Sequence, residues 1–403
     1  MSAIARPWEK YPFLLTGRFV AAALGHFAVD FLNSLRPLLW ALLSLRLGLS
    51  NTEIGFFAMS ATLMAALSQP VFGWLADRYG GRWFGALGLL WMAVLYAVVG
   101  MMHSRLVLWA LVLAALGSGA FHPQGAMNAS QAGGNKRTLA TSIFFTAGQM
   151  ALGLGPAVGG VLLGLFDTQV LVTVALFTLP IVALMWVYTP NERTSAASEE
   201  MAEMREGARE FGAGRRRMLI VAAFVGLVFL RSWAGHSNIA FLPKFLQDRG
   251  WPHEWQGIAL TAYMLSSATA VIVFGRLADE FGRHRLLPIG LFGAVLPMYL
   301  YPHLSGPFIF LGIALTGAFI GGIHSILIVM AQNLLPSRMA LASGLALGFM
   351  FASGAVGQMA TGVLADTFGL ANTLSGLAVP LFIAGLLSLV VRMNASSVKG
   401  HTS

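Results

Sequence analysis

The chain has 403 residues, of which 57% are hydrophobic and only 10% are charged, and its formal net charge is +9. A soluble protein needs more polar surface than this, so the composition excludes that class and indicates a protein that crosses a membrane repeatedly. The absence of cysteine excludes disulfide bonds and thiolate metal sites.

Apolar segments long enough to cross a membrane recur along the whole chain. Each has roughly 18–28 residues, and about 20 suffice to cross a hydrocarbon core of about 30 Å. The first segment lacks a small-residue cleavage site and is too long for a signal peptide, so we expect it to remain in the mature protein. We predict an all-α membrane protein with twelve transmembrane helices, at 18–45, 52–75, 84–102, 106–128, 138–165, 169–188, 217–244, 254–277, 285–303, 307–330, 338–363 and 370–392.

The Lys and Arg residues outside these segments are distributed very unevenly. If the N-terminus is cytoplasmic, only Arg46, Arg105, Lys244 and Arg249 lie on the outer side. Positive residues concentrate in cytoplasmic loops, so we expect a multi-pass protein of the inner (cytoplasmic) membrane with both termini in the cytoplasm. Topology then explains the positive charge, and we expect no nucleic-acid partner.

Asp30 is the acidic residue that lies deep in a predicted membrane helix, and it is the first candidate functional residue. A carboxylate costs on the order of 3 kcal/mol or more there, so it should face a polar cavity or bind a proton. His26 lies four residues earlier, on the same face of the helix, and could relay that proton. The alternative role for Asp30 is a permanent ion pair with Arg36 or Arg231.

An eight-residue sequence near the end of the second segment recurs in the second half of the chain. Gly73-Trp-Leu-Ala-Asp77-Arg-Tyr-Gly80 matches Gly275-Arg-Leu-Ala-Asp279-Glu-Phe-Gly282, which begins 202 positions later. The same offset relates Gly119 to Gly321 and His122 to His324. This repeat predicts two pseudo-symmetric six-helix bundles, 1–188 and 217–403, joined by a polar cytoplasmic linker at 189–216.

The duplicated signature, followed by basic residues, resembles the loop between helices 2 and 3 of the major facilitator superfamily, and the resemblance extends over essentially the whole chain. It implies a transporter that works by alternating access. Glycines permit a tight turn, and an aspartate can cap a helix or pair with arginine. The alternative is a plain helix–turn–helix connector. The gating candidates in these loops are Gly73, Asp77, Arg78, Gly80, Arg82, Gly275, Asp279, Gly282 and Arg283.

A narrower resemblance links the chain to the fosmidomycin-resistance branch of that superfamily, whose members export a phosphonate antibiotic and related compounds by proton antiport. It rests on His26-Phe-Ala-Val-Asp30, Phe121-His122-Pro123 and the segment 331–338. Gly155 and Pro156, in the sequence Gly-Pro-Ala-Val-Gly-Gly, are similar to an antiporter motif and are further gating candidates, with a simple packing face as the alternative. This chain has Gln124 where the branch often has an acidic residue, so the resemblance does not define the substrate.

The resemblance also implies that helices 1, 4, 7 and 10 line a central cavity. Pseudo-symmetry places Arg231 at the depth of Asp30, and an ion pair that opens on protonation would couple the two. Two arginines against one carboxylate favour an anionic substrate. Instead of binding substrate, one arginine could face a helix dipole or backbone carbonyl groups, and the histidines could serve only as hydrogen-bond partners between helices. The substrate-binding candidates are Arg36, His122, Gln124, Arg231, His236, His324 and Gln332.

The sequence does not support an enzyme. It offers no paired nucleophile and base, no phosphate-binding loop and no metal cluster, because His26 and His122 lack an evident third ligand. We expect no cofactor, and we expect a monomer in the lipid bilayer whose partners are protons and a small molecule. The predicted function is proton-coupled antiport that exports a small organic, drug-like or phosphonate-like anion. The alternatives are uptake of an organic anion by proton symport and a non-transporting ligand sensor or channel.

Overall fold

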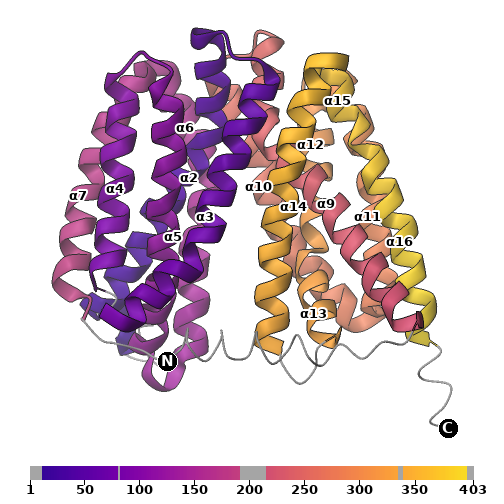
Figure 1. Ribbon diagram of the computed structural model, residues 1–403, viewed down its shortest axis with the longest axis horizontal. Coiled ribbons are helices and arrows are strands. Elements are labelled where there is room, and N and C mark those ends of the chain that lie inside the picture. Colours follow the sequence, from indigo (N-terminus) through magenta and orange to yellow (C-terminus); the bar gives the residue numbers. More distant parts are fainter. Residues whose placement is uncertain (1–10, 80–81, 191–214, 335–338, 397–403) are drawn as a thin grey trace, which may run out of the picture. The chain divides into compact units, whose positions relative to one another are not determined.

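The computed structural model describes residues 11–79, 82–190, 215–334 and 339–396, and in these ranges the chain is helical with no strand (Figure 1). The long helices of the first half are α2 (Gly17–Leu47), α3 (Asn51–Tyr79), α4 (Arg82–Met101), α5 (Leu106–Ala132), α6 (Arg137–Phe166) and α7 (Val170–Tyr188). The α-helices of the second half are α9 (Arg215–Asp248), α10 (His253–Phe281), α11 (Arg283–Leu300), α12 (Phe308–Gly322), α13 (His324–Leu334), α14 (Met339–Phe368), α15 (Leu370–Gly376) and α16 (Ala378–Ser396). Short 3-10 helices are η1 (Pro12–Leu15), η2 (Gly134–Lys136), η3 (Asp167–Gln169) and η4 (Tyr301–His303).

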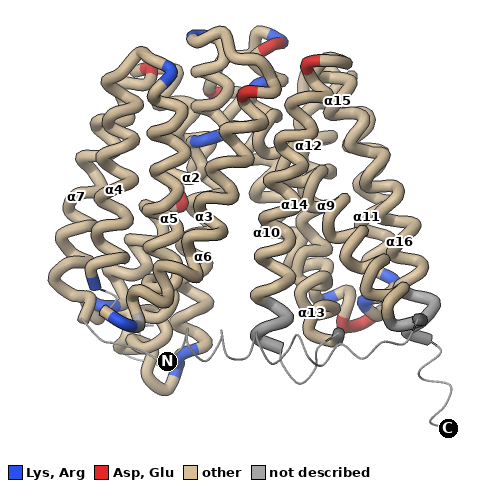
Figure 2. Tube along the Cα trace, viewed as in Figure 1, with Lys and Arg blue, Asp and Glu red and all other residues tan. Residues whose placement is uncertain are grey.

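The predicted helical fold is confirmed. The described chain has 11 stretches long and apolar enough to cross a membrane, and one of these, Gly134–Tyr188, contains both α6 and α7. Two predicted spans are interrupted: the tenth is divided into α12 and α13 at Ile323, and the twelfth into α15 and α16 at Leu377. Charged residues are sparse along the middle of the helices and gather near their ends, as expected for helices that cross a bilayer (Figure 2).

The helices pack into two compact units. The first unit contains residues 1–36 and 64–199, and the second contains 37–63 and 200–403. α2 therefore passes from the first unit to the second at Pro37, which lacks the amide hydrogen that would bond to the Asn33 carbonyl. The division into bundles 1–188 and 217–403, with a linker between them, follows chain order and stays a prediction.

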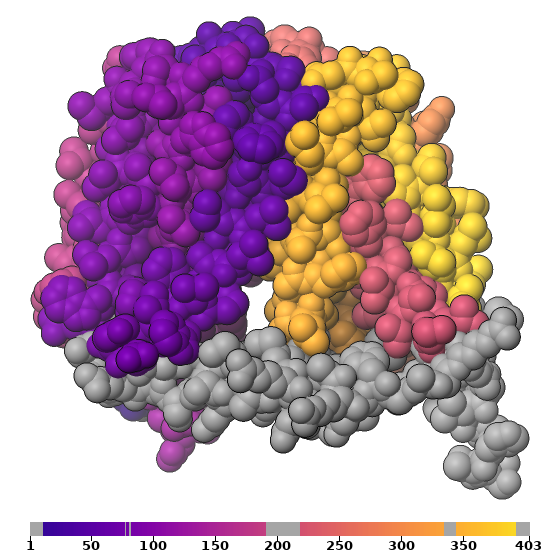
Figure 3. All heavy atoms as spheres, viewed as in Figure 1, coloured from indigo at the N-terminus to yellow at the C-terminus, as the bar shows by residue number. Residues whose placement is uncertain are grey.

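Glycines bring helix backbones together within each unit, where side chains fill the space between the helices (Figure 3). In the first unit, a Cβ on Gly117 of α5 would lie 2.2 Å from the Gly88 carbonyl oxygen of α4. The residues that the repeat pairs, Gly119 and Gly321, make matching contacts. A Cβ on either one would lie 1.9 Å from a serine Oγ of a neighbouring helix, that of Ser68 or Ser267. Small residues at such contacts are how membrane helices associate closely.

We predict that Gly117→Ala destabilises the first unit, because the added methyl group would overlap the α4 backbone. Overpacking of this kind costs typically about 1–3 kcal/mol, so the melting temperature of the purified protein should fall. Gly376→Ala is the control, because a Cβ at Gly376 meets no atom within 4 Å. Equal melting temperatures for the two variants would contradict the tight α4–α5 contact.

Candidate functional site

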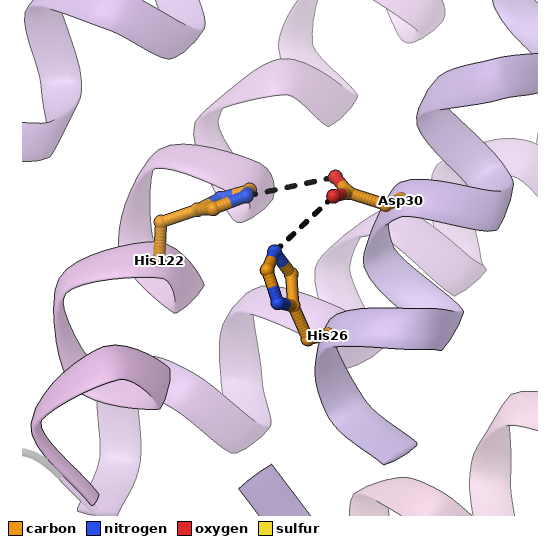
Figure 4. A group of neighbouring side chains, drawn as sticks. All are labelled: His26, Asp30 and His122. Atoms are coloured by element: carbon orange, nitrogen blue, oxygen red, sulfur yellow. Dashed lines mark ion pairs between the residues drawn. The ribbon is translucent and has the colours of Figure 1, made fainter. Parts of the chain in front are cut away.

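Asp30 lies between two histidines in the first unit (Figure 4). His26 Nε2, on the same helix α2, lies 3.2 Å from Asp30 Oδ2, and His122 Nε2, from α5, lies 3.5 Å from Asp30 Oδ1. The side chains of His26 and Asp30 are buried, whereas that of His122 is 24% exposed. The predicted pair of His26 and Asp30 thus has a third member, His122, which was predicted to bind the substrate.

Both histidines are held in the same tautomer by backbone carbonyl groups. Nδ1 of His26 lies 2.8 Å from the Phe144 carbonyl oxygen, and Nδ1 of His122 lies 2.8 Å from the Ser118 carbonyl oxygen. A carbonyl oxygen only accepts hydrogen bonds, so each Nδ1 must carry a hydrogen. In the neutral state both Nε2 atoms are then acceptors, and they face a carboxylate that is also an acceptor. A bound cation, of which a proton is the smallest, would remove this conflict between acceptors.

Asn33 connects Asp30 to Arg36 along α2. Its Nδ2 donates to Asp30 Oδ1 at 3.0 Å and to Ser118 Oγ at 3.0 Å. Its Oδ1 accepts a hydrogen bond from Arg36. Arg36 is thus joined to the carboxylate through one intervening amide, although it lies on a different face of the helix. Polarity within an apolar helix was the signal in the sequence that could have identified Asn33.

α6 completes the surroundings of the cluster. The ring of Phe144 stacks on that of His26, with centroids 4.1 Å apart. A Cβ on Gly148, one turn further along α6, would lie 2.5 Å from His26 Nε2 and 2.6 Å from Asp30 Oδ2. Gly148 is therefore necessary for the close approach of α6. Gly148 was not among the residues predicted from the sequence, although a glycine within a helix often marks such an approach.

Arg231 is the buried cation of the second unit, on α9. Its Nε and Nη2 donate to the Ile320 carbonyl oxygen at 3.2 and 2.6 Å. This carbonyl belongs to the last turn of α12, where the chain breaks before α13 and leaves carbonyl groups without helical partners. Arg231 thus caps the end of α12. This agrees with the alternative interpretation of the arginines, in which one of them faces backbone carbonyl groups. Among the described residues no carboxylate lies within ion-pair distance of it.

The other substrate-binding candidates occupy both units. In the second unit, His236 of α9 bonds through Nδ1 to the Ser232 carbonyl oxygen at 3.1 Å and packs against Gly354 of α14. His324 is the first residue of α13, directly after the break at Ile323. Gln332 is partly buried on α13. In the first unit, Gln124 is buried on α5, beside Gly85 of α4.

The structure describes most, but not all, of the residues predicted to act in gating. Gly80 and the Asp77 side chain lie outside the described residues, and the guanidinium of Arg78 lies over the rings of Trp74 and Tyr79. In the second copy, Asp279 Oδ1 lies 3.9 Å from Arg283 Nη2. Gly282 has a φ of 92°, a backbone conformation that favours glycine. Gly275 occupies the position in the second copy that Gly73 occupies in the first.

The remaining gating candidates lie at helix contacts in the first unit. The Arg82 guanidinium lies 5.5 Å from the centre of the Trp186 ring. Gly155 and Pro156 are buried within α6, and a Cβ on Gly155 would overlap Ser34 Oγ of α2 at 2.1 Å. Gly155 therefore allows α6 and α2 to pack closely. A gating role for these residues stays a prediction.

The cluster also has the dimensions of a metal site. Among the described residues, His26, Asp30 and His122 form the group whose ligand atoms all lie within 4.8 Å of one another. Imidazoles that donate through Nδ1 and bind through Nε2 are common in metal sites, and three ligands with one open position are typical of zinc. The reason given from the sequence, that His26 and His122 lack a third ligand, was wrong, because Asp30 supplies one. The expectation that no metal is bound stays a prediction. A proton needs only one or two of these atoms.

A family model confirms the resemblance seen in the sequence. The model of the Major Facilitator Superfamily matches residues 19–253 and again 226–402. The chain belongs to the Major Facilitator Superfamily. It is therefore a multi-pass membrane transporter and not an enzyme.

Similar proteins include resistance and efflux proteins. The fosmidomycin resistance protein of Escherichia coli K12 is 28% identical over 358 residues, which cover 86% of each chain. An uncharacterized transporter of this type from Bacillus subtilis, YfnC, is 26% identical and covers 97% of this chain and 95% of its own. The multi-drug resistance efflux pump PmrA of Streptococcus pneumoniae is 26% identical over 80% of this chain and 83% of its own.

Solved structures share the fold at lower identity. A bacterial homologue of the human lysosomal transporter Spinster, in an inward-facing and occupied conformation, matches with a TM-score of 0.76 and 15% identity, over 96% of this chain and 97% of that chain. The nucleoside transporter NupG matches with a TM-score of 0.73 and 14% identity, over 93% of this chain and 98% of that chain. At this identity the likeness concerns the fold alone.

We predict that Gly148→Ala abolishes most of the transport activity of this protein without unfolding it. The added methyl group would overlap both His26 and Asp30 and would separate them. Gly226→Ala is the control, because its Cβ would meet only the flexible end of the Leu387 side chain, at 3.1 Å. Transport should fall at least about tenfold in Gly148→Ala alone, since misplacing a reacting group by about 1 Å can cost far more. Equal transport by the two variants would contradict the prediction.

Proposed function

We propose that this protein is a proton-coupled antiporter that exports a small organic anion by alternating access. The cluster of His26, Asp30 and His122 carries the proposal, because a bound cation would remove the conflict between a buried carboxylate and the two imidazole acceptors that face it. No nucleotide-binding motif is evident in the sequence, so an ion gradient would supply the energy. The names of the similar proteins, fosmidomycin resistance and multi-drug efflux, support export.

Coupling would work through the charge of the cluster. With one proton bound at a Nε2 atom, the resulting imidazolium donates to Asp30 and the pair is neutral overall. Without it, Asp30 retains only the Asn33 amide as a neutral donor among the contacts described above, and the cluster carries a negative charge. Gaining and losing the proton therefore changes the electrostatic potential at Arg36, which Asn33 joins to Asp30. An anion near Arg36 would be held more tightly when the cluster carries its proton, which is the relation that the symport alternative needs. Antiport needs uptake of the proton to accompany release of the anion.

The basic groups favour an anionic substrate. Arg231 uses two of its nitrogen atoms on one carbonyl oxygen, and a guanidinium has donors to spare for a carboxylate or phosphonate. His236 lies on the same helix α9, and because its Nδ1 bonds to the Ser232 carbonyl oxygen, its Nε2 would donate to an anion only when the ring is protonated. Proton symport for uptake of an organic anion is the second candidate, because the same cluster would serve transport in either direction.

The experiment that tests coupling is Asp30→Asn. The amide keeps the size of the side chain but removes the carboxylate that holds the proton, so net transport driven by a pH gradient in proteoliposomes should be lost. Exchange of labelled for unlabelled substrate, which needs no net proton movement, should persist. Asp248→Asn is the control, because Asp248 pairs with Lys244 at the end of α9. Gradient-driven transport by Asp30→Asn would overturn the role of Asp30.

Two further measurements identify the compounds carried, in cells, and the direction of transport, in proteoliposomes. Cells that express the protein should survive phosphonates or other anionic antimicrobials better than cells with an empty vector. Outward substrate movement against a gradient, driven by inward proton movement, supports export. Accumulation inside under the same gradient would instead establish the symport alternative.

We predict that Arg36→Gln and Arg231→Gln each weaken the binding of anionic substrates, by about tenfold or more, because a charge-assisted hydrogen bond contributes about 1.5–3 kcal/mol. Binding of a neutral substrate should change little. Arg249→Gln is the control, because Arg249 also donates to backbone carbonyls, those of Pro302 and Leu304, but at the end of α9. Tight binding of a lipophilic cation that survives both changes would contradict an anionic substrate.

A further inference from the structure

A third copy of the duplicated sequence lies at the end of α14. Gly362-Val-Leu-Ala-Asp366-Thr-Phe-Gly369 has the glycines, the Leu-Ala-Asp sequence and the aromatic residue at the positions of the other two copies. Gly369 has a φ of 81°, like Gly282 at 92°, so both end their helix in the left-handed region. The offset of 202 does not find this copy, because it pairs Asp366 with Gly164.

The third copy lies at the opposite membrane face from the second. Three passes, α11, α12 with α13, and α14, separate the end of α10 from the end of α14. An odd number of passes reverses the face. Figure 1 shows α13 and α15 at opposite ends of α14, in agreement with this order. The basic residues that follow the other two copies are absent here.

Asp366 caps the start of α3 with both carboxylate oxygens. Oδ1 accepts a hydrogen bond from the Asn51 amide and Oδ2 from the Thr52 amide, each at 2.8 Å. Residues 51–63 of α3 and all of α14 belong to the second unit, so this contact lies within one compact body. A helix N-terminus has free amide groups and a partial positive charge, which a carboxylate satisfies. The aspartate of the second copy, Asp279, makes no such contact with a helix start among the described residues.

The two helices approach closely below this cap. A Cβ on Gly362 would lie 2.4 Å from the Asn51 carbonyl oxygen, and a Cβ on Gly55 would lie 2.6 Å from the Gln358 carbonyl oxygen. Thr62 donates to Gln358 Oε1 at 3.1 Å, one further step along the same face of α3. The start of α3 is thus held to α14 along about three turns, with Asp366 at the end that faces water.

We propose that Asp366 and the glycines beneath it form a latch, which holds the start of α3 on α14 in one half of the transport cycle and releases it in the other. The proposal rests on alternating access, the proposed function. α3 begins in the second unit and ends in the first, so this helix must bend or leave α14 when the units rearrange. The latch is suited to release, because Asp366 is exposed and water can replace its two hydrogen bonds. The latch therefore favours the state in which α3 contacts α14 but still allows the two helices to separate.

The test measures whether α3 leaves α14, and it does not depend on transport. The chain contains no cysteine, so a single Ala58→Cys can be labelled specifically. Ala58 is 4% exposed and lies on the face of α3 that carries Gly55 and Thr62. An impermeant maleimide, added to sealed proteoliposomes from either side, should label this thiol only when α3 separates from α14.

Two variants are compared in this background, each with a matched control. Asp366→Ala removes the cap, and Thr367→Val changes the next residue, whose hydroxyl bonds only to its own helix at the Val363 carbonyl. Gly362→Ala forces α3 away, and Gly348→Ala makes the same change on α14 where a Cβ meets no atom within 4 Å. The labelling rate should rise about tenfold in Asp366→Ala and in Gly362→Ala, and it should stay unchanged in both controls, since loss of a helix cap shifts an equilibrium by about that factor.

Equal rates within either pair would overturn the latch. Monodisperse elution and an unchanged helical spectrum show that each variant is folded, and Gly362→Ala tests the same contact if Asp366→Ala does not fold. If the rates differ as expected but the wild type moves no substrate, the latch stands and the proposed function fails. If transport is confirmed but the rates do not differ, the latch fails alone.

Discussion

A carboxylate within a bilayer is expensive unless hydrogen-bond donors or positive charge surround it, and this constraint organises the first unit of the protein. Asp30 receives its surroundings from three helices. α2 supplies His26 and Asn33, α5 supplies His122, and α6 approaches closely enough to bond His26 only because position 148 is glycine. Three helices of the first unit therefore meet at this one carboxylate.

Close helix contacts through small residues are the second physical basis of the fold. Membrane helices gain little from burying apolar side chains against one another, because lipid is equally apolar, so they depend on close backbone packing. The repeat reproduces the same glycine–serine contact in both units, at Gly119 and at Gly321. The polar chemistry is not duplicated. The first unit presents a carboxylate with two imidazoles, whereas the second presents a guanidinium that caps the broken end of α12.

The three copies of the eight-residue sequence show how one local motif serves different contacts. In the two copies that the structure describes in full, the second and the third, the aspartate lies near a helix end and the last glycine lies where the helix stops. Whether the aspartate pairs with an arginine in its own loop, as Asp279 does, or caps another helix, as Asp366 does, depends on which helix lies beside it. The motif therefore defines a turn with an available carboxylate, and its partner is supplied by the fold.

The sequence by itself determined the helical membrane class, the internal repeat, the superfamily, and the pair of His26 and Asp30. These features are local, because hydropathy depends on consecutive residues and an i,i+4 pair shares one helical face. It did not predict the contacts of His122 and Asn33 with Asp30, the need for glycine at 148, the break at Ile323 that Arg231 caps, or the cap of α3 by Asp366. Each of these depends on the distance between side chains or backbones far apart in the chain, and only the packing of the helices decides that distance.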